Sequence, residues 1–344
     1  MTSFGAEATR SRSTMREVAA LAGVSVKTVS RVINGEPGVS ELLTAQVRAA
    51  IDRLDYRPNL TASTLRRSDG RTAAIGLLLE DVANPFSSLL HREIENFALS
   101  RGVLVFAGSS DEDQAREREL IAEFISRRVD GLIIVPASHD HSYLQNEHRA
   151  GTATVFVDRP PQFLDADSVL TDNEAGARAG VRHLIAGGHR RIAYLGDLQI
   201  IATAASRYRG YVAEMSSHKL DIDPQLVRLD VRGIESAESE VTDLVSSLQP
   251  PTAIFTGQNL LTIGAYRALR KLGLHRTIAL VGFDDFELAD MLEPGVTVMA
   301  QDPAAMGRAA AEILFRRIDG DRSASIHNVI ATRLIARGSG EIKP

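Results

Sequence analysis

From residue 73 onward, short apolar segments alternate with longer amphipathic segments, and this alternation restricts the fold more than any other feature of the sequence. The apolar segments predict strands at residues 74–79, 103–107, 131–135, 154–157, 192–196, 253–256 and 278–282. The amphipathic segments predict helices at residues 85–100, 112–126, 173–186, 260–272 and 303–318. Strands that are apolar on both sides are typical of parallel sheets with helices on both faces.

The number of predicted strands favours two doubly wound parallel sheets. The chain changes from the first sheet to the second near residues 169–172 and returns near residues 300–303. We therefore predict a ligand-binding core at residues 72–340, with an N-subdomain at about 72–170 and 302–330 and a C-subdomain at about 171–301 and 331–340. Because ligands of such sheets bind beyond the carboxyl ends of strands, polar residues that directly follow a strand are the first candidates for a site.

Residues 15–34 have a different pattern, that of a helix-turn-helix, in which apolar positions recur three and four residues apart on two short helices. Gly23 supplies the turn, and Ser25 is placed to cap the second helix. A third helix, capped by Ser40, is predicted to run to about Leu54. The apolar positions that would share one core are Val18, Leu21, Ala22, Val29, Val32, Ile33, Leu43, Val47, Ala50, Ile51 and Leu54.

The outer face of the second helix is polar and basic, as expected of a helix that enters the major groove of DNA. Val26, Lys27 and Arg31 are predicted to contact base edges, and Ser25 and Thr28 to contact phosphates. We predict an all-α headpiece at residues 13–57, a disordered tail at 1–12 and a linker with helical potential at 58–71. The alternative is an ordinary pair of amphipathic surface helices. The candidate DNA contacts of the headpiece are Thr14, Ser25, Val26, Lys27, Thr28, Ser30, Arg31 and Asn34.

The net charge of the chain changes sign between the segment with the helix-turn-helix pattern and the predicted core. The whole chain has a formal net charge of −5, which by itself does not suggest a nucleic-acid partner. Residues 1–71, however, contain 11 Lys and Arg against 7 Asp and Glu, whereas the remainder contains 28 against 37. The basic part is therefore the part with the helix-turn-helix pattern, and its predicted partner is double-stranded DNA.

Several other classes of protein are disfavoured by what the sequence lacks. The chain has no cysteine, which excludes disulfides and thiolate metal sites, and the pattern expected of a secretory signal or a membrane span is absent. We expect a cytoplasmic protein without a membrane partner. No nucleophile elbow, phosphate-binding glycine loop or dinucleotide fingerprint is present, so we expect neither an enzyme nor a cofactor. His139, Asp140, His141 and His148 are interpreted as polar surface rather than as a metal site.

An ordered set of motifs resembles the lactose/galactose repressor family over nearly the whole chain. The set begins with the helix-turn-helix pattern and ends with the Val-Gly-Phe-Asp-Asp segment at residues 281–285. Between them lie Tyr-Arg-Pro-Asn at 56–59, Asn-Pro-Phe at 84–86, Val-Asp-Gly-Leu-Ile at 129–133, Val-Asp-Arg-Pro at 157–160, Asp-Asn at 172–173, Gly-His-Arg-Arg-Ile at 188–192 and Arg-Tyr-Arg-Gly-Tyr at 207–211. The resemblance implies a core similar to the type I periplasmic-binding-protein fold.

The resemblance also implies a homodimer on a pseudo-palindromic operator, with a hinge helix from each subunit in the central minor groove. Leu65 matches the family's leucine that wedges between base pairs, Ala62 lies where the paired hinge helices approach, and Arg66 is placed for phosphate. Tyr56 and Asn59 belong to the same DNA-binding set. The alternative for Leu65 is a residue that packs the linker against the core.

For the core, the resemblance implies a small effector bound between the two subdomains. The matching residues are Asn84, Phe86, Asp158, Arg207, Gln258, Asp284 and Gln301. Such side chains suit a polyhydroxy ligand, because carboxylates accept hydroxyl hydrogen bonds and arginine donates them. A sugar or sugar derivative is favoured, followed by a nucleoside or purine. The chain has Gln258-Asn259 where the family commonly has Asn-Asp, so the effector of a relative cannot be transferred to it.

Other readings of the core remain open from the sequence. Asp284 and Asp172 could simply cap helices, and Asn84 could be a pre-proline turn residue. The predicted function is an effector-controlled transcriptional regulator, with a repressor favoured over an activator. A periplasmic-type sugar receptor that does not bind DNA is the alternative.

Overall fold

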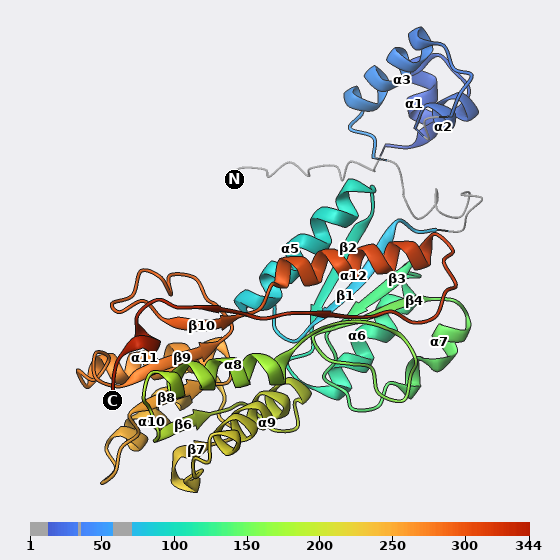
Figure 1. Cartoon of the computed structure of the whole chain (residues 1–344). Coiled ribbons are helices and arrows are strands. Elements are labelled where there is room, and N and C mark those ends of the chain that lie inside the picture. Colours follow the sequence, from blue (N-terminus) through green and yellow to red (C-terminus); the bar gives the residue numbers. More distant parts are fainter. Residues whose placement is uncertain (1–12, 34–35, 58–70) are drawn as a thin grey trace, which may run out of the picture. The chain divides into compact units, whose positions relative to one another are not determined.

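The computed structural model describes residues 13–33, 36–57 and 71–344, which fall into two compact units with a division between Thr72 and Ala73 (Figure 1). Several predictions lie outside the described residues: the tail at 1–12, Asn34, and most of the linker, including Asn59, Ala62, Leu65 and Arg66. Among the residues that are described, no helix is long and apolar enough to cross a membrane.

The first unit is a three-helix headpiece of α1 (Met15–Ala22), α2 (Val26–Ile33) and α3 (Glu41–Arg53). Thr14 and Glu17 form a capping box at the start of α1, and Gly23, at φ 64°, ends that helix in the left-handed conformation that glycine adopts without strain. The buried side chains at the centre of the headpiece are Val18, Ala19, Val29, Val47, Ala50 and Tyr56.

The predicted inward position of Leu21 is wrong, because its side chain is 43% exposed. The face of α1 that packs inward contains Met15, Val18, Ala19 and Ala22, which recur at the spacing of one helical stripe. At 100° per residue, Leu21 lies roughly a quarter turn or more from the middle of that stripe.

The first half of the second unit is a fully parallel sheet in the order β11-β5-β4-β3-β1-β2. Helices α5 (Pro85–Ser100) and α12 (Pro303–Ile318) lie side by side on one face of it, and α6 (Gln114–Ser126) covers the other (Figure 1). The strands are β1 (Ala74–Leu79), β2 (Leu104–Ser109), β3 (Gly131–Ile134), β4 (Ala153–Val157), β5 (Asp167–Thr171) and β11 (His327–Ile330). The short helix α7 (Gln145–Arg149) follows β3.

The second sheet has the order β12-β10-β9-β8-β6-β7 and is parallel except for β12, which runs antiparallel to β10. Helices α8 (Asn173–Ala186) and α9 (Ala202–Ser217) cover one face, and α10 (Gly233–Val245) and α11 (Asn259–Lys271) cover the other. The strands are β6 (Ile192–Leu195), β7 (Val227–Arg228), β8 (Ala253–Thr256), β9 (Ala279–Phe283), β10 (Thr297–Ala300) and β12 (Arg333–Ile335). The prediction of two doubly wound sheets is therefore confirmed.

The strands that the sequence did not predict lie mostly where the sheets join or end. β11 and β12 are edge strands with exposed and half-buried residues in turn, so they lack the continuous apolar run of a central strand. β5 begins with Asp167 and Ser168, and both side chains are buried. The chain passes between the sheets after β5, after β10 and after β11, so the two halves of the second unit are held together by three connections.

Candidate functional site

One cavity of about 420 Å³ in the second unit brings together all seven residues predicted to bind an effector. Six of them follow the carboxyl ends of strands: Asn84 after β1, Phe86 in the first turn of α5, Asp158 after β4, Gln258 after β8, Asp284 after β9 and Gln301 after β10. Arg207 comes from the second turn of α9 (Ala202–Ser217). Strand ends from both sheets thus contribute to one site, as the position of ligands in open α/β sheets predicts.

Seven further residues line the same cavity and were not predicted: Glu80, Arg159, Asp197, Ile201, Thr203, Ala204 and Gly257. Glu80, Arg159 and Asp197 lie one or two residues beyond β1, β4 and β6, so the rule that polar residues after strands form the site could have found them. Ile201, Thr203 and Ala204 form the start of α9, a helix for which the sequence had no prediction. Nothing in their residue types marked them as part of a site.

Arg207 organises the side of the cavity that belongs to the second sheet. Its Nε donates to Asn173 Oδ1 at 2.7 Å, and its Nη1 donates to Gly257 O at 2.8 Å and to Asp284 Oδ2 at 3.1 Å. The guanidinium also lies over the ring of Phe283, 3.9 Å from its centroid. Since Arg207 is only 5% exposed, these contacts fix its position before any ligand arrives.

Asp284 faces Arg207 and does not cap the helix-like turn that follows it. Its Oδ1 accepts from Gln301 Nε2 at 2.6 Å while its Oδ2 accepts from Arg207. The residue has φ 67°, a left-handed conformation that aspartate tolerates better than most residues. Asp172 also does not cap its helix, because its side chain accepts instead from the backbone N–H of Thr332 at 2.7 Å. Both helix-cap alternatives are therefore wrong.

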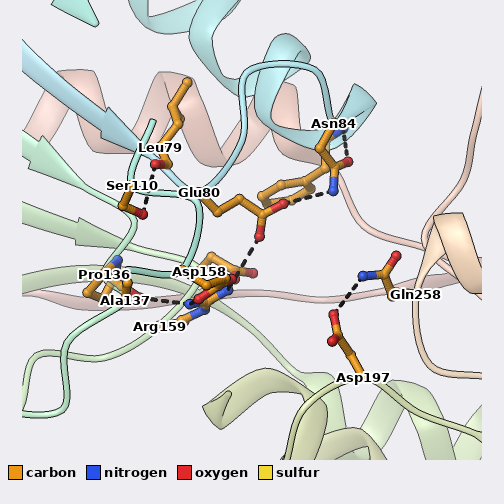
Figure 2. Close-up of polar contacts among 12 residues, drawn as sticks. Leu79, Glu80, Asn84, Ser110, Pro136, Ala137, Asp158, Arg159, Asp197 and Gln258 are labelled. Carbon is orange, nitrogen blue, oxygen red and sulfur yellow. Dashed lines mark hydrogen bonds and ion pairs between the residues drawn. The ribbon is translucent and has the colours of Figure 1, made fainter. Parts of the chain in front are cut away.

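A second arginine organises the side of the cavity that belongs to the first sheet (Figure 2). Arg159 donates from Nη1 and Nη2 to the two carboxylate oxygens of Glu112, at 2.7 and 2.6 Å, and from Nη2 to Glu80 Oε2 at 3.3 Å. Burial raises the pKa of Glu80 to about 7, because the lost hydration outweighs the attraction of Arg159. Burial likewise raises the pKa of Asp158, whose Oδ2 lies 3.6 Å from Arg159 Nε.

A hydrogen bond beside the cavity joins the two halves of the second unit. Asn259 Nδ2, from the start of α11, donates to Asn84 Oδ1 at 3.0 Å, and Asn84 Nδ2 donates to Glu80 Oε1 at 2.8 Å. Asn84 Oδ1 also accepts from Phe86 N and so caps α5. Asn84 therefore has a structural role at the start of this helix and also lines the cavity. Gln258 Nε2 donates to Asp197 Oδ2 at 2.7 Å, and Figure 2 shows this pair facing Glu80 and Asn84.

The cavity has polar groups without partners and an excess of negative charge. Arg159 Nε and Gln301 Oε1 are buried and form no hydrogen bond with any residue that the structure describes. Four carboxyl groups line the space, those of Glu80, Asp158, Asp197 and Asp284, against the two guanidinium groups of Arg159 and Arg207. Such a lining can bind several hydroxyl groups at once, because each carboxylate accepts and each arginine donates.

In the headpiece, α2 presents its first turn to solvent. Ser25 Oγ accepts from Thr28 N at 3.1 Å and pairs with Thr28 Oγ1 at 2.9 Å, so the predicted cap is present. Val26 and Lys27 are exposed beside it. Arg31 is held within the headpiece: its Nη2 donates to Pro37 O at 2.8 Å, and its Nε lies 3.5 Å from Glu36 Oε2.

Two other candidate residues of the headpiece differ from expectation in their exposure. The side chain of Tyr56 is 8% exposed and packs in the headpiece core, so its main contribution is to packing. Ser30 is half-buried on α2. Thr14 is exposed, and it holds the start of α1 through its capping box with Glu17.

The interpretation as polar surface holds for His139, Asp140 and His148, which are exposed, and is wrong for His141. His141 is fully buried, its Nδ1 accepts from the backbone N–H of Gln162 at 2.8 Å, and its ring meets that of Phe156 edge-on. In the part of the chain that the structure describes, no group of three His, Asp or Glu side chains is placed to hold a metal ion.

Comparison with known proteins gives both units a family. Residues 14–59 match the family described as bacterial regulatory proteins, lacI family, and residues 181–340 match the periplasmic binding protein-like domain. The ribose operon repressor of Escherichia coli K12 is 34% identical over 309 residues, which cover 89% of this chain and 93% of the relative. The structure of the lac repressor dimer bound to operator and the anti-inducer ONPF matches with a TM-score of 0.84 at 25% identity. The match covers 96% of this chain and 99% of that chain. A transcriptional regulator CelR–cellobiose complex has a TM-score of 0.69 at 29% identity, covering 95% of this chain and all of that one. The chain therefore belongs to the LacI family of bacterial regulatory proteins.

Proposed function

We propose that this protein is a transcriptional repressor that binds a pseudo-palindromic operator as a homodimer and changes its operator affinity when a neutral sugar occupies the cavity. The observation that carries the proposal is the convergence on one cavity of the seven residues that the family resemblance predicts, in a chain that also contains a LacI-type headpiece. Because its partner is DNA, we expect the protein to act in the cytoplasm.

The charge of the cavity supports a neutral effector. Even if Glu80 is protonated near neutral pH, three carboxylates face two arginines, and both arginines already have carboxylate partners. A phosphate or carboxylate on the effector would meet net repulsion in a site of low dielectric constant. A sugar, by contrast, can donate hydroxyl hydrogen bonds to Asp158 and Asp284. A relative that represses a ribose operon and a solved relative bound to cellobiose are consistent with this class. A nucleoside or purine is the second candidate.

Control of DNA binding requires that the effector distinguish two arrangements of the subdomains. A ligand held by Asp158 on one side and Arg207 on the other would favour the arrangement in which both contacts form. The Asn259–Asn84 hydrogen bond joins the two halves beside the cavity and would break if they separated. We propose that this change is passed to the headpiece through the linker at 58–71, within the domain limits that the sequence predicts.

For the DNA contacts, exposure supports Val26 and Lys27 as base-edge contacts, Ser25 as a phosphate contact and Thr14 as a DNA contact. Thr28 is half-buried, and its contact with phosphate remains a proposal from the sequence. Arg31 would have to leave Pro37 and Glu36 to reach a base, so we assign it a smaller part in recognition. Ser30, Asn34, Asn59, Ala62, Leu65 and Arg66 remain proposals from the sequence.

The test is selection of genomic DNA fragments by the full-length protein at low salt, followed by titration of the selected site at several salt concentrations. We expect site-specific binding that weakens steeply with salt and is altered by a neutral sugar. Lys27→Ala should relax the sequence preference and weaken binding about tenfold, whereas Asp158→Asn should keep DNA binding and lose the response to sugar. A protein that binds sugar but selects no DNA would instead be a receptor of the periplasmic type. If the activity of a reporter under the selected promoter falls when the gene for this protein is deleted, the protein is an activator.

A further inference from the structure

His141 joins two segments of the second unit that follow neighbouring strands. The segment at 135–141 follows β3, and the segment at 158–166 follows β4. The backbone N–H of His141 donates to Gln162 O at 3.1 Å, and the backbone N–H of Gln162 donates to His141 Nδ1 at 2.8 Å. His141 is fully buried, and its ring centroid lies 4.8 Å from that of Phe156 in β4. The imidazole is therefore part of the interior that holds the two segments together.

The hydrogen bond from Gln162 fixes the protonation state of the ring. A backbone N–H can only donate, so Nδ1 of His141 must offer its lone pair, and the proton of the neutral imidazole lies on Nε2. Nε2 is buried and forms no hydrogen bond with any residue that the structure describes. A second proton would have to bind Nδ1, where it would meet the N–H of Gln162. Protonation of His141 therefore breaks this hydrogen bond and places a charge in the interior.

Among the described residues, the titratable groups that face the imidazole are Glu117 of α6, His139 and Asp140 of its own segment, and Tyr143. Segment 158–166 presents the backbone of Gln162 to it, and β4 presents a phenyl ring. Glu117 is fully buried, and it already accepts hydrogen bonds from the Tyr143 hydroxyl and from two backbone N–H groups of segment 135–141. Burial lowers the pKa of His141 below its ordinary value of 6.5, because the attraction of Glu117 and Asp140 does not offset the lost hydration.

The contact between the two segments weakens in acid. The contribution of His141 to stability is complete above pH 6.5 and is lost as the pH falls below that value, because the opened chain then binds a proton that the folded ring excludes. One excluded proton shifts the opening equilibrium by about tenfold between pH 7.5 and 5.5. Segment 158–166 begins with Asp158 and Arg159, which line the effector cavity, so its opening alters one wall of that cavity.

We propose that His141 is an acid-sensitive latch between segments 135–141 and 158–166. At neutral pH its uncharged ring holds Gln162, and in acid a proton on Nδ1 releases Gln162 and lets the two segments separate. This latch works within the second unit and requires neither DNA nor a sugar, so its failure and that of the proposed repressor function are separate results.

The experiment is hydrogen–deuterium exchange of the full-length protein at pH 7.5 and 5.5, read at the Gln162 amide. After correction for the intrinsic pH dependence of exchange, we expect the opening constant of this amide to rise about tenfold in acid. Side-chain ¹H–¹⁵N correlation spectra of the wild type should show His141 as the Nε2–H tautomer at both pH values, because the folded ring stays neutral.

His141→Asn is the test variant, because Oδ1 of asparagine is bonded to Cγ, as Nδ1 of histidine is, and can accept from the Gln162 N–H without titrating. We expect its opening constant at Gln162 to change less than about twofold between the two pH values. His148→Asn makes the same substitution at an exposed position and should keep the rise seen in the wild type. Each protein is compared with itself at the two pH values, so the packing that the smaller asparagine loses does not enter the result.

A rise of less than about threefold at Gln162 in the wild type, or a tenfold rise that persists in His141→Asn, would overturn the latch. A wild-type spectrum in which folded His141 carries its proton on Nδ1, or is charged at pH 5.5, would overturn it as well. The spectrum needs no substitution, so it decides the protonation state even if His141→Asn does not fold.

Discussion

Replacing Arg207 with methionine should destabilise the second unit more than any surface arginine does. Arg207 is 5% exposed and binds Asn173, Gly257 and Asp284, and Asp284 is itself 8% exposed. Methionine fills much of the space but leaves the Asp284 carboxylate buried with only Gln301 as a donor. Removal of one partner from a buried ion pair costs about 3–5 kcal/mol. For a unit of this size, that corresponds to a loss of roughly 5–9 °C in melting temperature.

The assay is differential scanning calorimetry of the full-length protein, with Arg209→Met as the matched control. Arg209 lies on the same helix, but its side chain is 60% exposed and pairs with the exposed Glu174, so its loss should cost about 1 kcal/mol or less. Adding Asp284→Asn to Arg207→Met should restore about 1–3 kcal/mol, because asparagine carries no charge and tolerates the positive φ of this position. The reasoning is refuted if Arg207→Met melts within 3 °C of the control, or if the second substitution adds its own loss.

Three further outcomes are expected. Gly210→Ala would place a Cβ 2.5 Å from Glu174 O where α8 and α9 cross, so calorimetry should show a loss of about 1–3 kcal/mol, against a negligible change for the exposed Ser216→Ala. Burial raises the pKa of Glu80 from 4.5 to about 7, so the contribution of this group to stability is complete below pH 4.5 and is lost as the pH rises through 7. Between about pH 5 and 8, the wild type should lose about 1–2 kcal/mol of unfolding free energy relative to Glu80→Gln. Parallel pH profiles of the two proteins would contradict this. Thr14→Ala removes the capping box of α1, and hydrogen exchange should report a headpiece destabilised by about 1 kcal/mol with the second unit unchanged.

The sequence by itself determined the alternation of helices and central strands and the residue types of the predicted site. Continuous apolar runs at β1, β4 and β8 could be recognised because central parallel strands are buried on both faces, a local property that composition alone reveals. For the same reason, the edge strands β11 and β12, with one exposed face, escaped prediction. The effector residues could be proposed one by one from the family resemblance.

Tertiary structure decided which of these residues meet and what state they are in. Asn84 and Asn259 are 175 positions apart, and only the packing of two sheets brings their side chains within hydrogen-bond distance. The raised pKa of Glu80 depends on burial, and burial at this position is not written in a local pattern of the sequence. A sequence specifies short-range periodicity directly, whereas desolvation and long-range contacts arise only when the whole chain has closed around the site.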